Sequence, residues 1–471
     1  MITTRFIVRF FLGVSLIGFL SMFIFGYKIL SQNNLERSYT DFYVVDYEVD
    51  HRQLDEELKA EIKPEEIINV TEPIILWWTP FTFEKGKYKT CGDVKCFFTN
   101  NREYRTHPMM KVFMFYGSDF TAWDLPLPRL PHHEWSLLHE ESPKNNMLFS
   151  FPEVMKLFNH TSTFRRESDY PISTQFVYNL EWLENDKYLV PTSMKNKYQD
   201  ELSPLIYTHS DCDPPSDRDH YTKLLMNYIN IDSYGSCLHN KDLPKHLQNP
   251  LEAMGHPDFY KIIAKYKFAL AMENGRCNDY ITEKIWRPLM AGAVPVILGA
   301  QTIKDFLPSN HSAIHIDDFK TVQDLATYLH YLNNNDVEYE KYLTWKKTGV
   351  TNNYLKTVLR EREWAVDSVE NPYSTVPNFI EGFECFVCRR IHENMKHKGA
   401  LKYQATVEHY GCPKPVKFDD HGRPDSNKSL EHDFEWDYFQ KVATALRYFH
   451  DKNIVFTRKE LSNKAGISPI F

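Results

Sequence analysis

Residues 268–299 read FALAMENGRCNDYITEKIWRPLMAGAVPVILG. An apolar run at 268–272 enters a polar turn, and a second apolar run at 293–299 is short and branched like a parallel strand. Between them Ile281, Ile285 and Leu289 recur every four residues, which predicts a helix with Asp279 as its N-cap. We therefore expect a strand–helix–strand unit whose helix start presents backbone amides to an anionic ligand.

The predicted helix also has a polar face, formed by Tyr280, Glu283, Lys284 and Arg287. This face could contact a ligand. It could equally be the solvent side of an ordinary crossover helix, because charged solvent faces are common. Spacing alone leaves both interpretations open.

The segments before this unit continue the alternation of strands and helices. Apolar strands are predicted at 203–208, 231–234 and 267–272, with helices at 218–229 and 256–266. Such alternation indicates a parallel, doubly wound sheet, in which ligands bind outside the carboxyl ends of the strands. The turns at 211–218 and 274–279 are therefore expected to face one site.

Composition and length fit a folded α/β protein with two domains. The chain has 471 residues, of which 42% are hydrophobic and 15% aromatic. Strands at 74–78 and 111–116 begin a first domain at 71–195, and a polar linker at 191–200 leads to a second at 196–390. A net charge of −8 argues against a nucleic-acid partner, which would require a basic surface.

The amino-terminal segment predicts a membrane anchor. Residues 10–27 form an 18-residue run without charge, about 27 Å of helix. Arg5 and Arg9 precede it, which predicts a cytosolic tail at 1–9, a type II signal anchor at 10–27 and a lumenal stem at 28–70. A cleaved signal peptide is the alternative. The polar extension at 391–471, with a helix expected at 434–448, receives no function.

A lumenal location would allow N-glycosylation and disulfide formation, and the sequence has residues for both. The sequons at Asn69, Asn159, Asn310 and Asn427 would be open to N-glycosylation. The eight cysteines are interpreted first as disulfides, although the pair Cys385 and Cys388 could also suggest metal or redox chemistry.

Two passages resemble signatures of the α-1,3-fucosyltransferase family. Residues 268–296 are similar to its donor motif, and FNHTSTFRRESD at 158–169, preceded by Glu141-Ser142-Pro143, is similar to its acceptor-domain signature. The resemblance covers roughly residues 72–390. Details at 277–280, 286–288 and 382–388 are most similar to the divergent animal branch numbered ten and eleven, whose members are described as endoplasmic-reticulum enzymes that fucosylate protein Ser or Thr.

The resemblance implies a fold and a set of site residues. The fold is the GT-B glycosyltransferase architecture, with two Rossmann-like domains facing across a cleft. Glu141 matches the position of the base in inverting fucosyl transfer, and Glu140 is its competitor. The implied GDP-fucose contacts are Arg218, Asn274, Tyr280, Glu283 and Lys284.

The resemblance also implies a disulfide framework, with Cys91 bonded to Cys385 and Cys96 to Cys388. A bond between Cys212 and Cys237 is a weaker expectation. Cys277 and Cys412 remain unassigned.

Metal and cofactor expectations are negative. Residues 211–213 and 217–219 read Asp-x-Asp, a metal-binding pattern in other glycosyltransferases, but such triplets are common by chance. We expect no metal site and no required cofactor beyond the co-substrate GDP-fucose, with stimulation by Mn²⁺ left open. Arg165 and Arg166 could shape the cleft or pair locally with Glu167 and Asp169.

The acceptor is the most open question. The family as a whole implies N-acetylglucosamine in glycans, whereas the branch implies Ser or Thr of a folded cysteine-rich protein domain, which we prefer. Trp123 and residues 132–135 could stack on a sugar or simply pack. A lumenal GDP-fucose-binding module without turnover and a transferase for another nucleotide sugar are the alternatives. The expected location is the endoplasmic reticulum or Golgi membrane.

Overall fold

The structure, a computed structural model, describes residues 70–81, 86–249, 253, 255–366, 376–426 and 431–468. Within those residues no helix is both long and apolar enough to cross a bilayer. The anchor expected at 10–27, the stem up to residue 69 and the sequons at Asn69 and Asn427 lie outside the described part of the chain.

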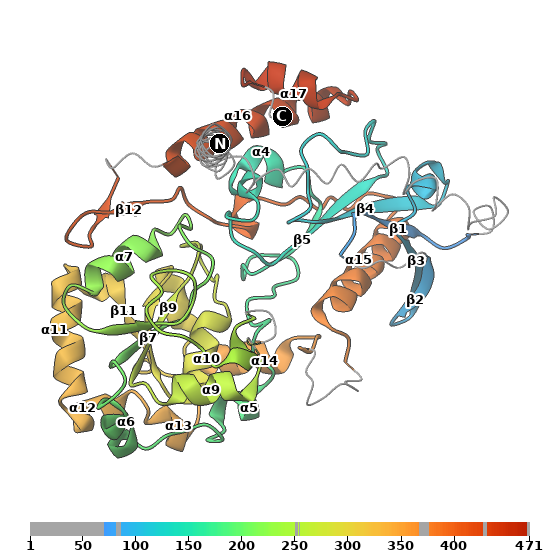
Figure 1. Ribbon diagram of the computed structural model, residues 1–471. Coiled ribbons are helices and arrows are strands. Elements are labelled where there is room, and N and C mark those ends of the chain that lie inside the picture. The colour runs from blue at the N-terminus through green and yellow to red at the C-terminus, as the bar shows by residue number, and fades with distance from the viewer. Residues whose placement is uncertain are drawn as a thin grey trace, which may run out of the picture. The chain divides into compact units, whose positions relative to one another are not determined.

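Two mainly parallel sheets organise the described residues (Figure 1). The first has the order β2-β3-β1-β4-β5-β6, and only β2 runs antiparallel to its neighbour. Its central strands are buried on both faces, as their continuous apolar runs predict. The strands are β1 (Ile74–Thr79), β2 (Lys87–Cys91), β3 (Val94–Thr99), β4 (Met110–Tyr116), β5 (Glu134–His139) and β6 (His160–Thr163).

The second sheet has the order β11-β10-β9-β7-β8 and is parallel throughout. Its strands are β7 (Leu205–Tyr207), β8 (Ile231–Ser233), β9 (Phe268–Met272), β10 (Val294–Leu298) and β11 (Ile314–His315). The chain runs from β7 to β8 on one side and then crosses to β9 on the other. The switch in strand order therefore falls between β7 and β9, where parallel sheets bind ligands.

Helices cover the second sheet and join the halves. The polar segment at 191–200, which the sequence predicts to be a linker, contains α6 with a buried Lys195. The Lys195 ammonium donates to the carbonyls of Ala264, Tyr266 and Gly292, at 2.7, 2.8 and 2.9 Å, and so holds α6 to the second half. In chain order, the described α-helices before residue 379 are α4 (Pro152–Met155), α5 (Leu180–Glu184), α6 (Thr192–Tyr198), α7 (Arg218–Leu225), α9 (Pro257–Ala264), α10 (Glu283–Ala291), α11 (Val322–Asn333), α12 (Asp336–Lys341), α13 (Trp345–Thr348) and α14 (Asn353–Glu361).

Helix α15 (Phe379–Lys396) returns to the first sheet, where it lies beside β2 and β3 (Figure 1). Phe383, Val387 and Ile391 pack in the same apolar cluster as β1 and β4. The expected boundary at 390 is therefore wrong for this helix, which belongs structurally to the first half. The disulfides Cys91–Cys385 and Cys96–Cys388 fasten it to β2 and β3, the pairing that the resemblance implies.

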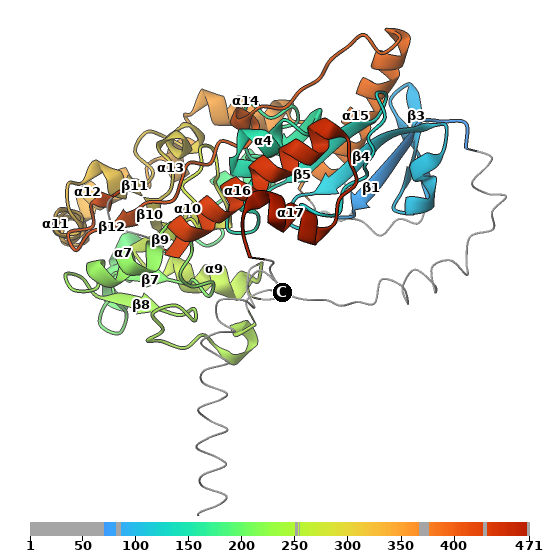
Figure 2. The same ribbon diagram turned by 90° about the horizontal axis from the view of Figure 1, so that it is seen from above.

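The carboxyl-terminal extension is folded against both halves. Helices α16 (Glu431–Lys452) and α17 (Arg458–Ala465) lie side by side, with α16 against α4 (Figure 2). Upstream, a short ribbon of β12 (Lys417–Phe418) and β13 (Pro424–Asp425) adjoins the second half, where the Phe418 amide donates to Asp217 at 2.9 Å.

Candidate functional site

A cavity of about 690 Å³ opens at the carboxyl ends of β7 and β8. Residues 208–211 and Arg218, which follow β7, line it together with residues 234–236 after β8. Helix α10 contributes Glu283, Lys284 and Arg287. The turns after β7 and β9 also touch directly, because the Ser216 hydroxyl donates to the Glu273 carbonyl at 2.7 Å. The cavity lies at the sheet edge where the strand alternation predicts ligand binding, but of the two turns expected there only the one at 211–218 lines it, and the turn at 274–279 does not.

Helix α10 begins later than expected. Asp279 is not its N-cap, because residues 279–282 are not helical and the cap is Thr282, whose hydroxyl accepts from the Lys284 amide at 3.4 Å. The Thr282 amide and hydroxyl in turn donate to the fully buried Glu273 carboxylate, at 2.7 and 2.8 Å. Three polar groups of the motif therefore fix the helix start, which places Glu283 and Lys284 in the first turn.

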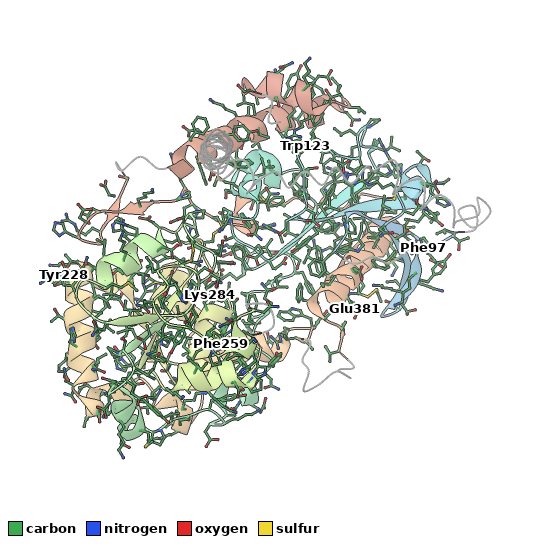
Figure 3. The ribbon with its side chains drawn as sticks, viewed as in Figure 1. Phe97, Trp123, Tyr228, Phe259, Lys284 and Glu381 are labelled. Carbon is green, nitrogen blue, oxygen red and sulfur yellow. A yellow bond between two sulfur atoms is a disulfide. The ribbon has the colours of Figure 1, made fainter. Side chains whose placement is uncertain are left out.

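The charged side chains at the start of α10 form ion pairs with one another. Lys284 Nζ lies 3.1 Å from Glu283 Oε1 and 3.8 Å from Glu273 Oε2. Burial opposes the charge on Glu283, yet Lys284 and Arg287 lower the pKa of its carboxyl to about 2. Burial likewise opposes the charge on Lys284, while Glu283 and Glu273 raise the pKa of its ammonium above the ordinary value. Lys284, labelled in Figure 3, therefore stays cationic, and it lines the cavity that could receive an anionic ligand.

Two buried polar atoms at this cavity, Arg218 Nε and His209 Nδ1, have no hydrogen-bond partner among the described residues. The other Arg218 nitrogens donate to the carbonyls of Met272, at 3.1 Å, and Asp211, so the guanidinium is held in place. Because native proteins rarely leave buried polar atoms unpaired, these two atoms are candidates for contacts with a bound ligand.

His209 is a cavity residue that the sequence analysis missed. Its Nε2 lies 2.9 Å from the Met272 carbonyl, and since a carbonyl only accepts, this nitrogen carries the proton. Burial, reinforced by Arg218 and Lys284, holds the pKa of the imidazole well below its ordinary value. The neutral ring therefore leaves Nδ1 as an acceptor, and this buried atom has no partner among the described residues. Its place directly after a short apolar strand was the available signal.

Glu141 links the two halves. It lies two residues beyond β5, and its Oε2 accepts a hydrogen bond from the Tyr280 hydroxyl at 3.1 Å. Burial raises the pKa of its carboxyl, although Lys284 opposes the shift. Nearby, a Cβ on Gly275 would come within 2.9 Å of Ser142 Cβ, so the Glu141 loop sits tightly against the donor motif. The structure thus brings Glu141 to Tyr280 and within the electrostatic reach of Lys284.

Glu140 occupies a different environment. Its Oε1 accepts from the Tyr116 hydroxyl at 2.8 Å, while Oε2 is buried and has no partner among the described residues. Burial raises the pKa of the Glu140 carboxyl to about 7, and Glu141 adds to the shift. Two adjacent carboxyls therefore share the end of β5, and only Glu141 contacts the donor motif through a hydrogen bond.

Asp279 forms the central ion pair between the halves. Arg165 Nη1 lies 2.9 Å from Asp279 Oδ2, and Arg166 Nη2 lies 2.7 Å from Oδ1. Asp279 is fully buried and adopts a left-handed backbone with φ of 62°. Arg166 also pairs with Asp305 at 2.9 Å. Of the two interpretations offered for these arginines, local pairing with Glu167 holds for Arg165 alone, and both arginines contact the motif turn.

The extension beyond residue 391 reaches this region, which no local pattern predicted. The Tyr410 hydroxyl donates to the Glu141 carbonyl at 3.0 Å, and its ring stacks on His139. Cys412 is bonded to Cys277 in the motif turn, and Cys212 to Cys237 beside the cavity. All eight cysteines are described and none is free.

Three of the four carboxylates in the two Asp-x-Asp triplets contact protein donors. Asp219 accepts from the Tyr207 hydroxyl and from the Asp213 amide, and Asp217 from the Phe418 amide. Asp211 pairs with Lys144 of the Glu141 loop. These contacts give Asp211, Asp217 and Asp219 a role in stabilising the fold.

Three further sequence expectations have clear outcomes. Trp135 is fully buried. Residues 132–135 lie at the amino end of β5, and Glu141 follows the other end of that strand. The Trp123 ring, labelled in Figure 3, packs against the Arg458 guanidinium. The Asn159 amide nitrogen donates to the Tyr403 carbonyl at 2.8 Å, so this sequon is engaged by the fold. Asn310, by contrast, is exposed.

Comparison with known proteins agrees with this geometry. Two family models match, "Glycosyltransferase family 10 (fucosyltransferase) C-term" at residues 198–406 and "Fucosyltransferase, N-terminal" at residues 70–175. GDP-fucose protein O-fucosyltransferase 3 of Gallus gallus is 47% identical over 82% of this chain and 82% of its own. Its counterpart from Homo sapiens is 47% identical over 82% and 81%. A crystal structure of an α1,3-fucosyltransferase with GDP-fucose aligns with a TM-score of 0.40 at 14% identity, covering 72% of this chain and 94% of that one.

Proposed function

The chain belongs to glycosyltransferase family 10, the fucosyltransferases, and we propose that it transfers L-fucose from GDP-β-L-fucose to a Ser or Thr hydroxyl of a folded, cysteine-rich protein domain. The relatives that support this acceptor are named protein O-fucosyltransferases. The observation that carries the proposal is Glu141, hydrogen-bonded to Tyr280 of the donor motif beside a cavity whose buried cations suit a diphosphate.

The two halves take separate roles in a GT-B arrangement. The second half holds GDP in the cavity, where Arg218 offers a fork of donors and Lys284 a compact charge. His209 accepts from a donor group of the nucleotide. Tyr280 and Asn274 do not line this cavity, and we assign them to the fucosyl side, where Tyr280 orients Glu141. The first half supplies Glu141 and receives the acceptor.

Transfer proceeds in one displacement. Glu141 takes the proton of the acceptor hydroxyl as its oxygen forms a bond to the anomeric carbon. The bond from that carbon to the β-phosphate oxygen breaks, and GDP leaves with the electron pair. Lys284 and Arg218 stabilise the negative charge that develops on the leaving diphosphate. Configuration at the anomeric carbon inverts.

Acceptor choice is the direct test of the proposal. With labelled GDP-fucose, the purified protein is expected to label a folded cysteine-rich domain, and to lose this labelling when the domain is reduced and unfolded. Free N-acetyllactosamine, offered in parallel, is expected to remain unlabelled. Labelling of the glycan alone would contradict the protein acceptor, and transfer from another nucleotide sugar alone would contradict the donor.

Metal independence is a second expectation, because cationic side chains stand where a metal would neutralise the diphosphate. An excess of chelator should leave the initial rate within about twofold of its untreated value. Loss of the activity with chelator and its return with Mn²⁺ would contradict this, whereas a modest stimulation by Mn²⁺ would not.

We further propose that the protein is anchored in the endoplasmic reticulum or Golgi membrane through residues 10–27, with its catalytic part lumenal. The four disulfides support an oxidising compartment. Protection from protease in sealed microsomes, lost on adding detergent, is the expected result.

A further inference from the structure

A second cavity, of about 700 Å³, lies at the amino-terminal edge of the first sheet. Its walls come from the starts of β4, β5 and β6, from the end of α15 with the chain that follows it, and from α16. The six residues of β5 separate this edge from the Glu140–Glu141 end by about 20 Å. The cavity is therefore distinct from the site that binds GDP-fucose.

The walls of this cavity are strongly cationic. The cations that line it are Lys111, Arg129, Lys156, Lys398, Lys402 and Arg447, while Glu134 is the one carboxylate among the described lining residues. The whole chain carries a net charge of −8, so this accumulation runs against the average composition.

Protein carboxylates neutralise little of this charge. Arg447 pairs with Asp451 at 2.9 Å, but within the described part of the chain the other five cations have no carboxylate partner. Glu134 is already engaged, by His160 Nε2 at 2.6 Å and by the Asn394 amide at 2.7 Å. A surplus of positive charge therefore faces the cavity.

Arg129 shows that this surplus is built into the fold. Its guanidinium is held by the carbonyls of His133 and Leu157, at 3.0 and 2.8 Å, and stacks over Trp135 at 4.6 Å. These acceptors are neutral, so they satisfy its donors without cancelling its charge. Burial lowers the pKa of Arg129 to about 10, with Arg447 adding to the shift and the nearby Glu134 carboxylate opposing it, so the guanidinium stays charged at neutral pH.

The neighbouring groups identify the ligand chemistry. The amides of Asn394, Gln404 and Asn453 donate to protein acceptors, which leaves the lysine ammoniums as the available donors. Burial, with nearby cations, lowers the pKa of both His133 and His450 to about 4. Both imidazole rings are therefore neutral at neutral pH and add no positive charge to the cavity. Point charges arranged around a space of ligand size suit a molecule that carries several tetrahedral oxyanions.

We propose that this cavity binds a small polyanion bearing sulfate or phosphate groups, at a site separate from donor and acceptor. Recognition is by charge: the exposed Lys156, Lys398 and Lys402 contact the oxyanions, and the half-buried Arg129 adds a positive charge that the fold holds in place. Binding should weaken as salt is raised, because exposed ion pairs are screened.

Calorimetric titration of the purified protein, at about 0.15 M salt, tests this directly. The probes are a heparin-derived tetrasaccharide for sulfate, inositol hexakisphosphate for phosphate, and the desulfated tetrasaccharide, which keeps only its carboxylates, as the control without sulfate. At least one of the sulfated and phosphorylated probes is expected to bind, and the one that binds identifies the source of the oxyanion. The desulfated probe should bind far more weakly than the sulfated one.

A charge-matched pair of variants locates the binding. Lys156→Glu with Lys402→Glu should weaken binding by about tenfold or more, while Lys223→Glu with Lys320→Glu, the same change in charge outside the cavity, should weaken it far less. Both pairs should keep fucosyl transfer. Failure of both the sulfated and the phosphorylated probe to bind, or an equal loss in the two pairs, would overturn the proposal.

Discussion

Replacing Glu141 with Gln is expected to lower the rate of fucosyl transfer by about 10²- to 10⁴-fold, the range for loss of a general base. Gln keeps the size of the side chain and can still accept from the Tyr280 hydroxyl, which lies 3.1 Å from Glu141 Oε2, but it cannot take the proton of the acceptor. GDP affinity should change little, because Glu141 does not line the GDP cavity. Steady-state rates and GDP titration on the same preparation separate the two effects.

The matched control is Glu140→Gln, because the neighbouring carboxyl is also buried and has a pKa raised to about 7. Glu140 contacts Tyr116 instead of the donor motif, so its variant should retain most of the activity. If Glu140→Gln abolishes transfer while Glu141→Gln remains near wild type, the roles of the two residues must be exchanged.

The same assignment fixes the direction of the pH dependence. A base works only when deprotonated, and burial raises the pKa of Glu141 above its ordinary value of 4.5. kcat/KM should therefore fall as pH drops through that raised pKa, at a higher pH than an exposed Glu would give. Because Glu140 and Glu141 interact, the measured value belongs to the pair.

Local patterns predicted the parts of this site that depend on neighbouring residues. The four-residue spacing of Ile281, Ile285 and Leu289 predicted a helix here, which begins at Glu283, two residues after Ile281. The strand alternation predicted a site at the carboxyl end of the second sheet, where the cavity lies. The prediction of Asp279 as the N-cap was wrong because its carboxylate pairs instead with two arginines more than 110 residues earlier in the chain. Spacing contains no information about such a partner.

Contacts between segments far apart in the chain could not be predicted from local sequence patterns. Tyr410 and Cys412 sit in a polar stretch without periodicity, yet one bonds to the Glu141 backbone and the other to Cys277. The return of α15 to the first sheet was foreseen only through the disulfides that the resemblance implied. The basic cavity likewise gathers lysines and arginines from residues 111–447, which no local window could assemble.

Replacing Asp279 with Asn is expected to lower the free energy of unfolding by about 3–5 kcal/mol, the cost of breaking a buried ion pair. Asn is chosen because it tolerates the left-handed backbone at residue 279, where φ is 62°, so the change isolates the charge. Arg165, which is almost fully buried, would keep Glu167 but lose its interior partner, and Arg166 would keep only Asp305. Urea unfolding with the disulfides intact, followed by tryptophan fluorescence, measures the effect.

Asp305→Asn provides the control, since it removes a carboxylate from the same Arg166 at a site whose side chain is 53% exposed. A solvent-exposed ion pair contributes about 0–1 kcal/mol, so this variant should unfold close to the wild type. Equal unfolding of the two variants would show that Asp279 stabilises the protein no more than a surface pair does. A large difference would instead place the energetic link between the halves at the donor motif itself, because the turn that orients Tyr280 toward Glu141 would be the same turn that holds the two sheets together.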